Sequence, residues 1–165
     1  MNLDIKKMDK EDEEELKDVE SLIKTYKDDF VVWDNYYDAG VQMDFFWNYK
    51  TDQTIVAKED NEVIGFLCYQ PESDRTDIPS EEPFTYLSLI LVDGEYRGEG
   101  IGSKMIGSLL ERLQNETINN PIVFGTWESN SAQISLAKKF GFELFDIKKN
   151  HRHNGESSLY YRKFV

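Results

Sequence analysis

The stretch Arg97-Gly98-Glu99-Gly100-Ile101-Gly102 decides the fold of this chain. An apolar run over residues 86–92 precedes it and an amphipathic run over residues 103–113 follows it, which predicts a strand, a tight glycine loop and a helix. The first N–H groups of a helix have no partner inside the helix, so they can bind a phosphate, and glycine lets the ligand approach the backbone. Arg97 adds a positive charge with a fork of donors. The stretch therefore predicts a pyrophosphate site.

The spacing of the glycines separates the known kinds of phosphate-binding loop. A P-loop requires Gly-x-x-x-x-Gly-Lys followed by Ser or Thr, and no window of the chain supplies it. A Rossmann fingerprint requires Gly-x-Gly-x-x-Gly in an early βαβ unit. Here Ser103 occupies the position of the third glycine, and the loop lies past the middle of the chain. The pattern that the residues do match is Arg-x-x-Gly-x-Gly, formed by Arg97, Gly100 and Gly102.

This pattern resembles the coenzyme A loop of the GNAT superfamily of N-acetyltransferases. The segment before the loop, residues 92–97, is similar to the family's strand end followed by Pro-Glu-Tyr-Arg, with Gly94 where proline is common. Downstream, Asn130 and the pair Gly141-Phe142 stand at family spacing around a helical segment. The loop and this downstream block together make the resemblance specific, and the order of elements matches from residue 3 to residue 165.

The resemblance implies an α/β fold with a mixed central sheet and helices on both faces, as a single N-acetyltransferase domain over residues 1–165. From the residue patterns we expect strands at residues 3–7, 54–58, 63–69, 84–92, 121–127, 143–149 and 157–165. Helices are expected after an N-cap at Asp9, around residues 36–47, at residues 103–113, and at residues 131–140 between Asn130 and Gly141. The acidic run at residues 11–15 is then a solvated helix start, where the helix dipole favours negative charge.

The composition narrows the class of partner. A formal net charge of −13 argues against nucleic acid, whose binding depends on cationic groups that neutralise phosphates. The charge is compatible with a cationic acceptor, such as a polyamine or a basic peptide, and equally with solubility alone. The N-terminus has no secretory signal, and no apolar stretch reaches the roughly 18 residues that span a membrane, so we expect a soluble protein without membrane association.

The single cysteine, Cys68, indicates the compartment. One cysteine cannot form a disulfide within the chain, so a reducing, cytoplasmic location is the default expectation. Cys68 lies in the apolar run at residues 63–69 and is expected to be buried.

The resemblance implies direct transfer of an acetyl group from the thioester of acetyl-CoA to an amine, without a metal or a covalent enzyme intermediate. The loop would hold the diphosphate, while the main chain of Ile90 and Val92 would pair with the pantetheine arm and polarise the thioester carbonyl. Asn130 matches a family asparagine that contacts the pantetheine region. The coenzyme-binding positions implied in this way are Ile90, Val92, Arg97, Gly98, Glu99, Gly100, Ile101, Gly102, Ser103 and Asn130.

The catalytic acid and base are not given by the resemblance. Many members carry a tyrosine seven residues after the family asparagine, but this chain has Ala137. Because a thiol has a pKa of roughly 8.5, the thiolate is a good leaving group and its release does not require a dedicated acid. Tyr160, Tyr161 or water could replace that acid. The carboxylates of Glu81, Glu82 and Glu128 are candidates for the base, and His151 and His153 could line the acceptor side.

An aromatic block over residues 30–49 falls where family members build the wall of the acceptor pocket. Most of its rings are expected in the core, and Trp33, Tyr36 and Tyr37 are the candidates for the pocket. With Asp34 and Asp38 nearby, these rings could hold a cation by cation–π contact.

Two functions from different classes follow. The first is an acetyl-CoA-dependent N-acetyltransferase acting on a cationic small-molecule or peptide amine. The alternative is a non-catalytic acyl-CoA-binding sensor or interaction module, which Ala137 keeps open. A nucleotide-binding protein of Rossmann type fails on glycine spacing and position. In this family, apolar C-terminal strands such as residues 159–165 often pair between subunits, so the resemblance also allows a homodimer.

Overall fold

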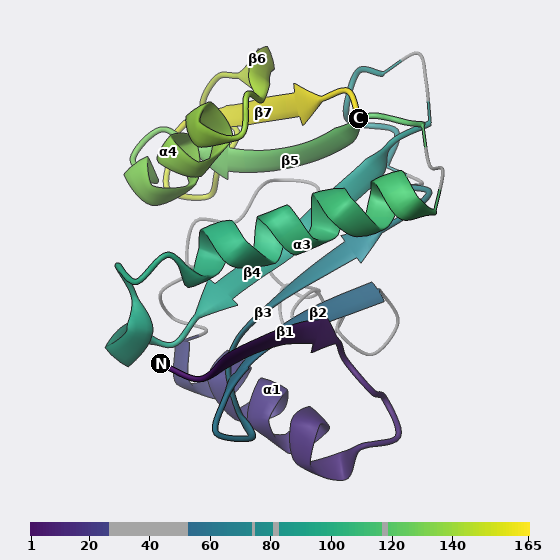
Figure 1. Ribbon diagram of the computed structural model, residues 1–165. Coiled ribbons are helices and arrows are strands. Elements are labelled where there is room, and N and C mark those ends of the chain that lie inside the picture. Colours follow the sequence, from purple (N-terminus) through teal and green to yellow (C-terminus); the bar gives the residue numbers. More distant parts are fainter. Residues whose placement is uncertain (27–52, 74, 81–82, 117–118) are drawn as a thin grey trace.

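A computed structural model describes residues 1–26, 53–73, 75–80, 83–116 and 119–165 (Figure 1). In chain order the elements are β1 (Leu3–Lys7), α1 (Glu13–Tyr26), β2 (Gln53–Glu59), β3 (Glu62–Gln70), β4 (Thr85–Val92), the 3₁₀ turn η3 (Gly94–Tyr96), α3 (Ile101–Asn115), β5 (Ile122–Trp127), α4 (Ser131–Lys139), β6 (Glu143–Lys148) and β7 (Ser158–Lys163). Every predicted strand is present. The helix expected around residues 36–47 lies outside the described residues.

The described strands form one seven-stranded sheet in the order β1-β2-β3-β4-β5-β7-β6. Neighbouring strands are antiparallel except β4 and β5, which are parallel. Those two strands pair only near their N-terminal ends, through Thr85 with Ile122 and Tyr86 with Val123. Figure 1 shows β4 and β5 diverging toward their C-terminal ends. The sheet is thus split at its centre, on the side where the glycine loop follows β4.

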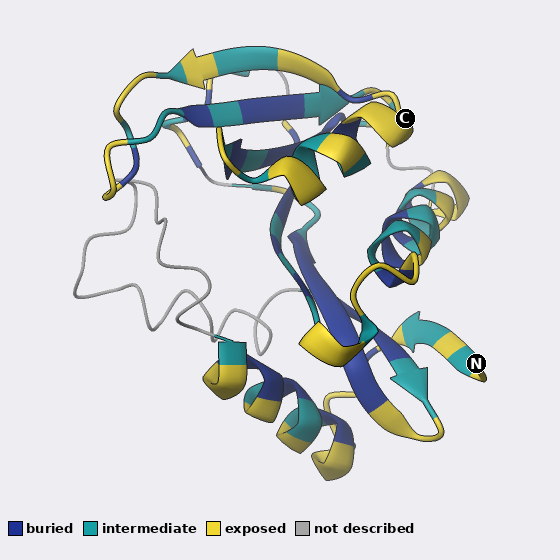
Figure 2. Cartoon of the chain, turned by 90° about the vertical axis from the view of Figure 1, so that its left-hand side faces the viewer, coloured by how far each residue is buried: buried dark blue, intermediate teal, exposed yellow. Residues whose placement is uncertain are grey.

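Helices cover both faces of the sheet, because alternate residues of each strand point to opposite sides. On one face, Val19, Leu22 and Ile23 of α1 pack with Phe66 of β3 in one core cluster. On the other face, α3 packs its apolar side in a second cluster that also includes Ala137 of α4. The buried sides of the helices face the buried central strands in Figure 2. The predicted mixed sheet with helices on both faces is confirmed.

The β2–β3 hairpin illustrates a turn set by local sequence. Asp60 and Asn61 form its two-residue loop, with φ of 49° and 67°. Positive φ at both positions is typical of a type I′ turn, whose twist suits a hairpin and for which aspartate and asparagine are favoured. The strands expected at residues 54–58 and 63–69 are confirmed, and this turn joins them as a hairpin.

The predicted N-cap of α1 is wrong. The helix begins at Glu13, and it is the Asp12 carboxylate that accepts hydrogen bonds from the N–H groups of Glu14 and Glu15, at 3.0 and 3.2 Å. Asp9 instead closes a turn before the helix by accepting from the Glu11 N–H at 2.9 Å. Both aspartates have a carboxylate that can cap a helix. Because Asp9 and Asp12 bracket a separate turn, the helix begins about one helical turn later than predicted.

Glu15 also departs from the expected solvated helix start, because its side chain is only 1% exposed. It accepts a hydrogen bond from the Asp9 N–H at 2.9 Å and from Lys58 Nζ at 3.1 Å, and it pairs with Lys6. Burial alone raises the pKa of this carboxyl, but the hydrogen bonds from Lys6, the Asp9 N–H and Lys58 outweigh burial, so the pKa is lowered. Lysines from β1 and β2 therefore turn one residue of an acidic run into a buried ion pair.

Candidate functional site

The loop between η3 and α3 has the backbone that the glycine pattern predicts. Gly98 and Gly100 have φ of 84° and 81°, in the left-handed region that favours glycine. A Cβ at either position would meet no protein atom within 4 Å, so within the chain itself it is the backbone conformation that favours glycine here. Gly100 is the N-cap of α3 and offers no side-chain acceptor to the first N–H groups of the helix.

A cleft of about 420 Å³ lies beside this loop, where β4 and β5 separate. It is bounded by the end of β4, the glycine loop, the start of α3, the end of β5 and the first turns of α4. The residues that line it are Ile90, Leu91, Val92, Tyr96, Arg97, Gly98, Gly100, Ile101, Gly102, Ser103, Trp127, Asn130, Ala132, Gln133 and Leu136. The side chains from β4 and α4 that line the cleft are mostly apolar, whereas at the glycine loop the lining consists largely of main-chain atoms.

The structure brings the predicted coenzyme positions together at this cleft, with one exception. Glu99 is exposed and is not among the lining residues, whereas the other nine positions named from the sequence all line the cleft. Sequence reasoning missed the contribution of Tyr96, Trp127 and Leu136. Trp127 ends a predicted strand, and Leu136 follows Asn130 by six positions on a predicted helix. The positions of these two residues in the predicted elements could therefore have identified them as cleft residues.

Asn130 has the two expected features in one place. Its side-chain oxygen accepts a hydrogen bond from the Gln133 N–H at 3.4 Å and caps α4, while the residue also lines the cleft. The helix ends as predicted: Gly141 has φ of 75°, and the Phe142 N–H donates to the Ala137 carbonyl at 2.9 Å. Ala137 is 1% exposed and belongs to the core beneath α4.

The charge of the cleft is positive in an otherwise acidic chain. Tyr96 and Arg97 are the ionisable side chains among the described residues that line the cleft, and none of these residues carries a carboxylate. A hydrogen bond with Glu59, together with burial, raises the pKa of Tyr96 to about 12, so its hydroxyl stays protonated at neutral pH. The cleft therefore presents one guanidinium and a set of N–H groups, a combination that favours an anion.

Arg97 is folded back along the chain. Its Nε–H donates to the Val92 carbonyl at 3.0 Å, and its Cζ lies 5.0 Å from the centroid of the Tyr26 ring. The Val92 carbonyl, one of the main-chain groups expected to face a ligand, thus already has a partner within the chain. Ile90 lines the cleft opposite Gly102, where an added Cβ would lie 3.9 Å from the Ile90 side chain.

The structure does not bring Glu128 or Tyr160, the described candidates for acid and base, to the cleft. Glu128 is exposed and accepts a hydrogen bond from the Ser157 N–H at 2.7 Å. Tyr160 is completely buried, on the face of the sheet away from α3, because alternation along β7 gives that face to Tyr160 and the α3 face to Tyr161. Neither Glu128 nor Tyr160 is among the lining residues. Glu81, Glu82, Trp33, Tyr36 and Tyr37 lie outside the described residues.

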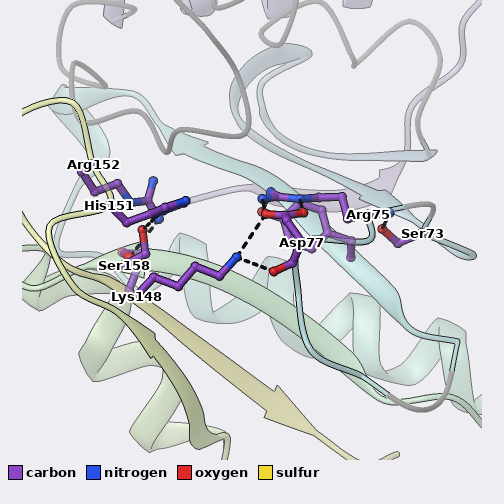
Figure 3. Close-up of polar contacts among 9 residues, drawn as sticks. Ser73, Arg75, Asp77, Lys148, His151, Arg152 and Ser158 are labelled. Carbon is purple, nitrogen blue, oxygen red and sulfur yellow. Dashed lines mark hydrogen bonds and ion pairs between the residues drawn. The ribbon is translucent and has the colours of Figure 1, made fainter.

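A polar network that the sequence did not predict lies on the face of the sheet away from α3, near the point where β4 and β5 separate (Figure 3). Arg75 donates through Nε to Asp77 at 2.9 Å and through Nη1 to the Tyr86 hydroxyl at 2.7 Å. Lys148 of β6 contacts Asp77 as well. Burial alone raises the pKa of Asp77, but Arg75 and Lys148 outweigh it and hold that pKa below its usual value. The network ties the segment after β3 to β4 and to β6.

The loop between β6 and β7 is held beside this network. His151 Nδ1 lies 2.7 Å from the Ser158 hydroxyl, and Arg152 donates to the Thr126 carbonyl at 2.9 Å. Arg152 Cζ also lies 5.5 Å from the centroid of the Trp127 ring. Trp127 also lines the cleft, so its ring lies between the cleft-lining residues and Arg152 in the chain of contacts.

In the part of the chain that the structure describes, no group of three or more His, Cys, Asp or Glu side chains could hold a metal ion. Among the described helices, none is long and apolar enough to cross a membrane.

Comparisons with known proteins agree with this geometry. The sequence model of the Acetyltransferase (GNAT) family matches residues 19–142. The chain is 28% identical over 87 residues to the spermine/spermidine N(1)-acetyltransferase of Bacillus subtilis (strain 168), covering 52% of this chain and 55% of the relative. It is also 28% identical over 88 residues to N-alpha-acetyltransferase 50 of Danio rerio, covering 53% of this chain and 49% of the relative. The chain thus spans about half the length of these curated relatives.

Solved structures share the fold. A chain from the crystal structure of the NatC complex bound to Gag peptide and CoA superposes with a TM-score of 0.74 at 20% identity, covering 100% of this chain and 99% of that chain. At this identity the likeness establishes the arrangement of the elements, which is the one described above.

Proposed function

Because the chain belongs to the Acetyltransferase (GNAT) family, we propose that it transfers an acetyl group from acetyl-CoA directly to an amine. The observation that carries the proposal is the cleft between the separating strands β4 and β5, closed at one end by the left-handed glycines of the loop. We also propose that residues 1–165 act as one domain, in the cytoplasm, without nucleic acid or membrane.

The lining of the cleft fits coenzyme A by its chemistry. Arg97 and the N–H groups of residues 98–103 would hold the diphosphate, because they combine a positive charge with unpaired donors at a helix start. Ile90, Val92 and Leu136 offer an apolar wall to the pantetheine arm, and Asn130 offers an amide beside it. Glu99 would contribute only its main chain, since its side chain is exposed.

The reacting carbonyl would be polarised by main-chain groups of β4. Beyond Tyr86, none of the described residues of β5 pairs with β4, so this edge of β4 faces the cleft and not a neighbouring strand. Donors fixed in a water-poor cleft stabilise developing negative charge without reorganising. Nothing in this step requires a metal.

Release of the thiolate would proceed without a dedicated acid. Ala137 supplies no proton and is buried in the core. Tyr96 lines the cleft, but with a pKa of about 12 it is a poor proton donor to a thiolate whose conjugate acid has a pKa of roughly 8.5. For the amine proton, Glu81 and Glu82 are our candidates, ahead of the exposed Glu128. Tyr160, a candidate for the acid, is buried away from the cleft.

For the acceptor we propose a cationic amine, either a small molecule or the end of a peptide. The net charge of −13 supports this choice, and the named relatives include both a spermine/spermidine N(1)-acetyltransferase and an N-alpha-acetyltransferase. Trp33, Tyr36 and Tyr37 are the residues that we propose for the acceptor pocket.

A release assay for coenzyme A thiol tests this function. The full chain is incubated with acetyl-CoA and a panel containing spermine, spermidine and short peptides with free N-termini. We expect thiol release with at least one amine, at a rate far above that with acetyl-CoA alone. Binding of acetyl-CoA without release for any amine on the panel would favour the alternative, a sensor or interaction module without turnover.

A further inference from the structure

The turn that joins β4 to the glycine loop is held by one side chain from the end of α1. The Tyr26 hydroxyl donates to Asp93 Oδ1 at 2.8 Å and accepts from the Gly94 N–H at 2.9 Å. The Tyr26 ring also lies beneath Arg97, whose Cζ is 5.0 Å from its centroid. A residue 67 positions before Asp93 thus contacts both the start and the end of this turn.

The same contacts give Gly94 a specific reason to be glycine. A Cβ at Gly94 would lie 3.1 Å from the Tyr26 hydroxyl oxygen, closer than nearly all real Cβ contacts. Proline, the residue common here in the resembling family pattern, also lacks the N–H that Gly94 donates. Tyr26 and Gly94 therefore form a matched pair in this chain, in which the glycine provides both the donor and the space.

Other bonds fix the rest of the turn around this pair. Asp93 Oδ1 accepts from the Glu95 N–H at 3.1 Å, and the Asp93 N–H donates to the Ile64 carbonyl at 2.8 Å. Arg97 then returns to β4 through its bond to the Val92 carbonyl. The Asp93 carboxylate also raises the pKa of Tyr26 by accepting its hydroxyl hydrogen bond, so the hydroxyl keeps its proton at neutral pH.

We propose that Tyr26 is a positioning residue for the coenzyme, an inference that rests on the function proposed above. Its hydroxyl fixes the turn at residues 93–94, and its ring fixes the plane of the Arg97 guanidinium at the rim of the cleft. A guanidinium held before the ligand arrives loses less conformational freedom on binding than a mobile one. Tyr26 thereby lowers the cost of binding the diphosphate and does not contact the reacting atoms.

Tyr26→Phe is the direct test, because it removes the hydroxyl and keeps the ring against Arg97. We expect the Kd of acetyl-CoA, measured by calorimetry, and the KM for acetyl-CoA each to rise roughly three- to tenfold, the effect of one or two hydrogen bonds. The kcat should stay within about twofold. A merely structural role would reduce the folded fraction and so lower the apparent kcat, leaving the KM unchanged. Tyr69→Phe, which removes a buried hydroxyl remote from the turn, is the matched control and should change neither constant.

Gly94→Pro tests the hydrogen bond between the Gly94 N–H and the Tyr26 hydroxyl by changing the donor instead of the acceptor. Gly94 is the first residue of η3, a position that suits proline, so the backbone should tolerate the change. Gly94→Pro removes the N–H and also places a Cβ against the Tyr26 hydroxyl, so we expect a rise in Kd at least as large. Tyr26→Phe in the same chain removes the hydroxyl that this Cβ meets, so the double variant should bind no more weakly than Gly94→Pro alone. Wild-type Kd in Tyr26→Phe, or additive losses in the double variant, would overturn the inference and leave the proposed function standing. Absence of acetyl-CoA binding by the folded wild-type chain would overturn both.

Discussion

Tyr86 of β4 pairs with Val123 of β5, and beyond this pair the two strands separate. The pair is the last rung of the parallel ladder, and the cleft opens past it. The Arg75 guanidinium bonds to the Tyr86 hydroxyl at 2.7 Å, so the network on the far face is attached to the point where the sheet divides. The point at which the sheet divides is thus held both by the strand pairing and by this network.

The conformation of the glycine loop can be tested at Gly100, whose φ is 81°. Gly100→Ala forces a side chain into the left-handed region, at a cost of about 1–2 kcal/mol, so we expect a lower Tm and a rise of tenfold or more in the Kd of acetyl-CoA. Gly107→Ala is the matched control, since Gly107 lies inside α3 and a Cβ there meets nothing within 4 Å. That change should raise the Tm slightly and leave the Kd unchanged. Equal Kd values for the two variants would contradict the role given to the loop backbone.

The buried carboxylate of Glu15 predicts a pH-dependent stability. Its pKa is lowered in the folded state, so its contribution is present above the pKa of the unfolded chain and is lost as pH falls through the folded pKa. Glu15→Gln should reduce the free energy of unfolding by about 1–3 kcal/mol at pH 7 and by progressively less below about pH 4. Denaturant unfolding at several pH values measures this difference. Glu14→Gln, at an exposed position of α1, should show no such trend. A constant difference between wild type and Glu15→Gln across pH would rule out the ion pair as its source.

The Arg75–Asp77 pair predicts an asymmetry between single and double variants. Arg75 has a side chain only 2% exposed, so Arg75→Met leaves a largely buried Asp77 carboxylate without its main partner. We expect a loss of about 2–4 kcal/mol in the free energy of unfolding. Arg75→Met combined with Asp77→Leu should recover much of that loss, because the carboxylate is then removed together with its main partner, while Lys148 keeps the Asp77 main-chain carbonyl as an acceptor. A double variant less stable than Arg75→Met would show that Asp77 stabilises the fold through contacts other than its ion pair with Arg75.

Ala137 predicts a mutation that does not improve catalysis. The side chain is 1% exposed and lies in the core, so Ala137→Tyr overpacks α4 and should cost about 1–3 kcal/mol of stability. If thiolate protonation does not limit turnover, kcat for the folded fraction should not rise. A large increase in kcat would show that the missing hydroxyl group is rate-limiting.

Features that depend on residues close in the chain could be predicted from the sequence. The tight glycine loop, the Asp60-Asn61 turn and the Asn130 cap are each set by a few consecutive residues, and the structure has all three. The Asp9 cap was wrong because Asp12 offers the same chemistry one turn later. Local pattern alone does not choose between two equivalent caps.

Features that depend on distant partners could not be predicted. Glu15 is buried by Lys58, 43 residues away, and Tyr26 reaches Asp93 across 67 residues. The sequence predicts both residues to be helical, with Glu15 as an exposed acid and Tyr26 as an aromatic residue on the apolar face of the helix. Only the packing of α1 against the sheet gives them their partners. For the same reason, the sequence could not choose among Tyr160, Tyr161 and water as the acid, and alternation along β7 puts Tyr160 on the face opposite α3.

Calorimetric titration of the folded chain with coenzyme A tests most directly that the cleft between β4 and β5 is a coenzyme site. We expect saturable binding with one site per chain, weakened tenfold or more in Gly100→Ala and unchanged in Gly107→Ala. Folded protein that gives no binding heat at millimolar coenzyme A, or that binds equally well in both variants, would contradict it.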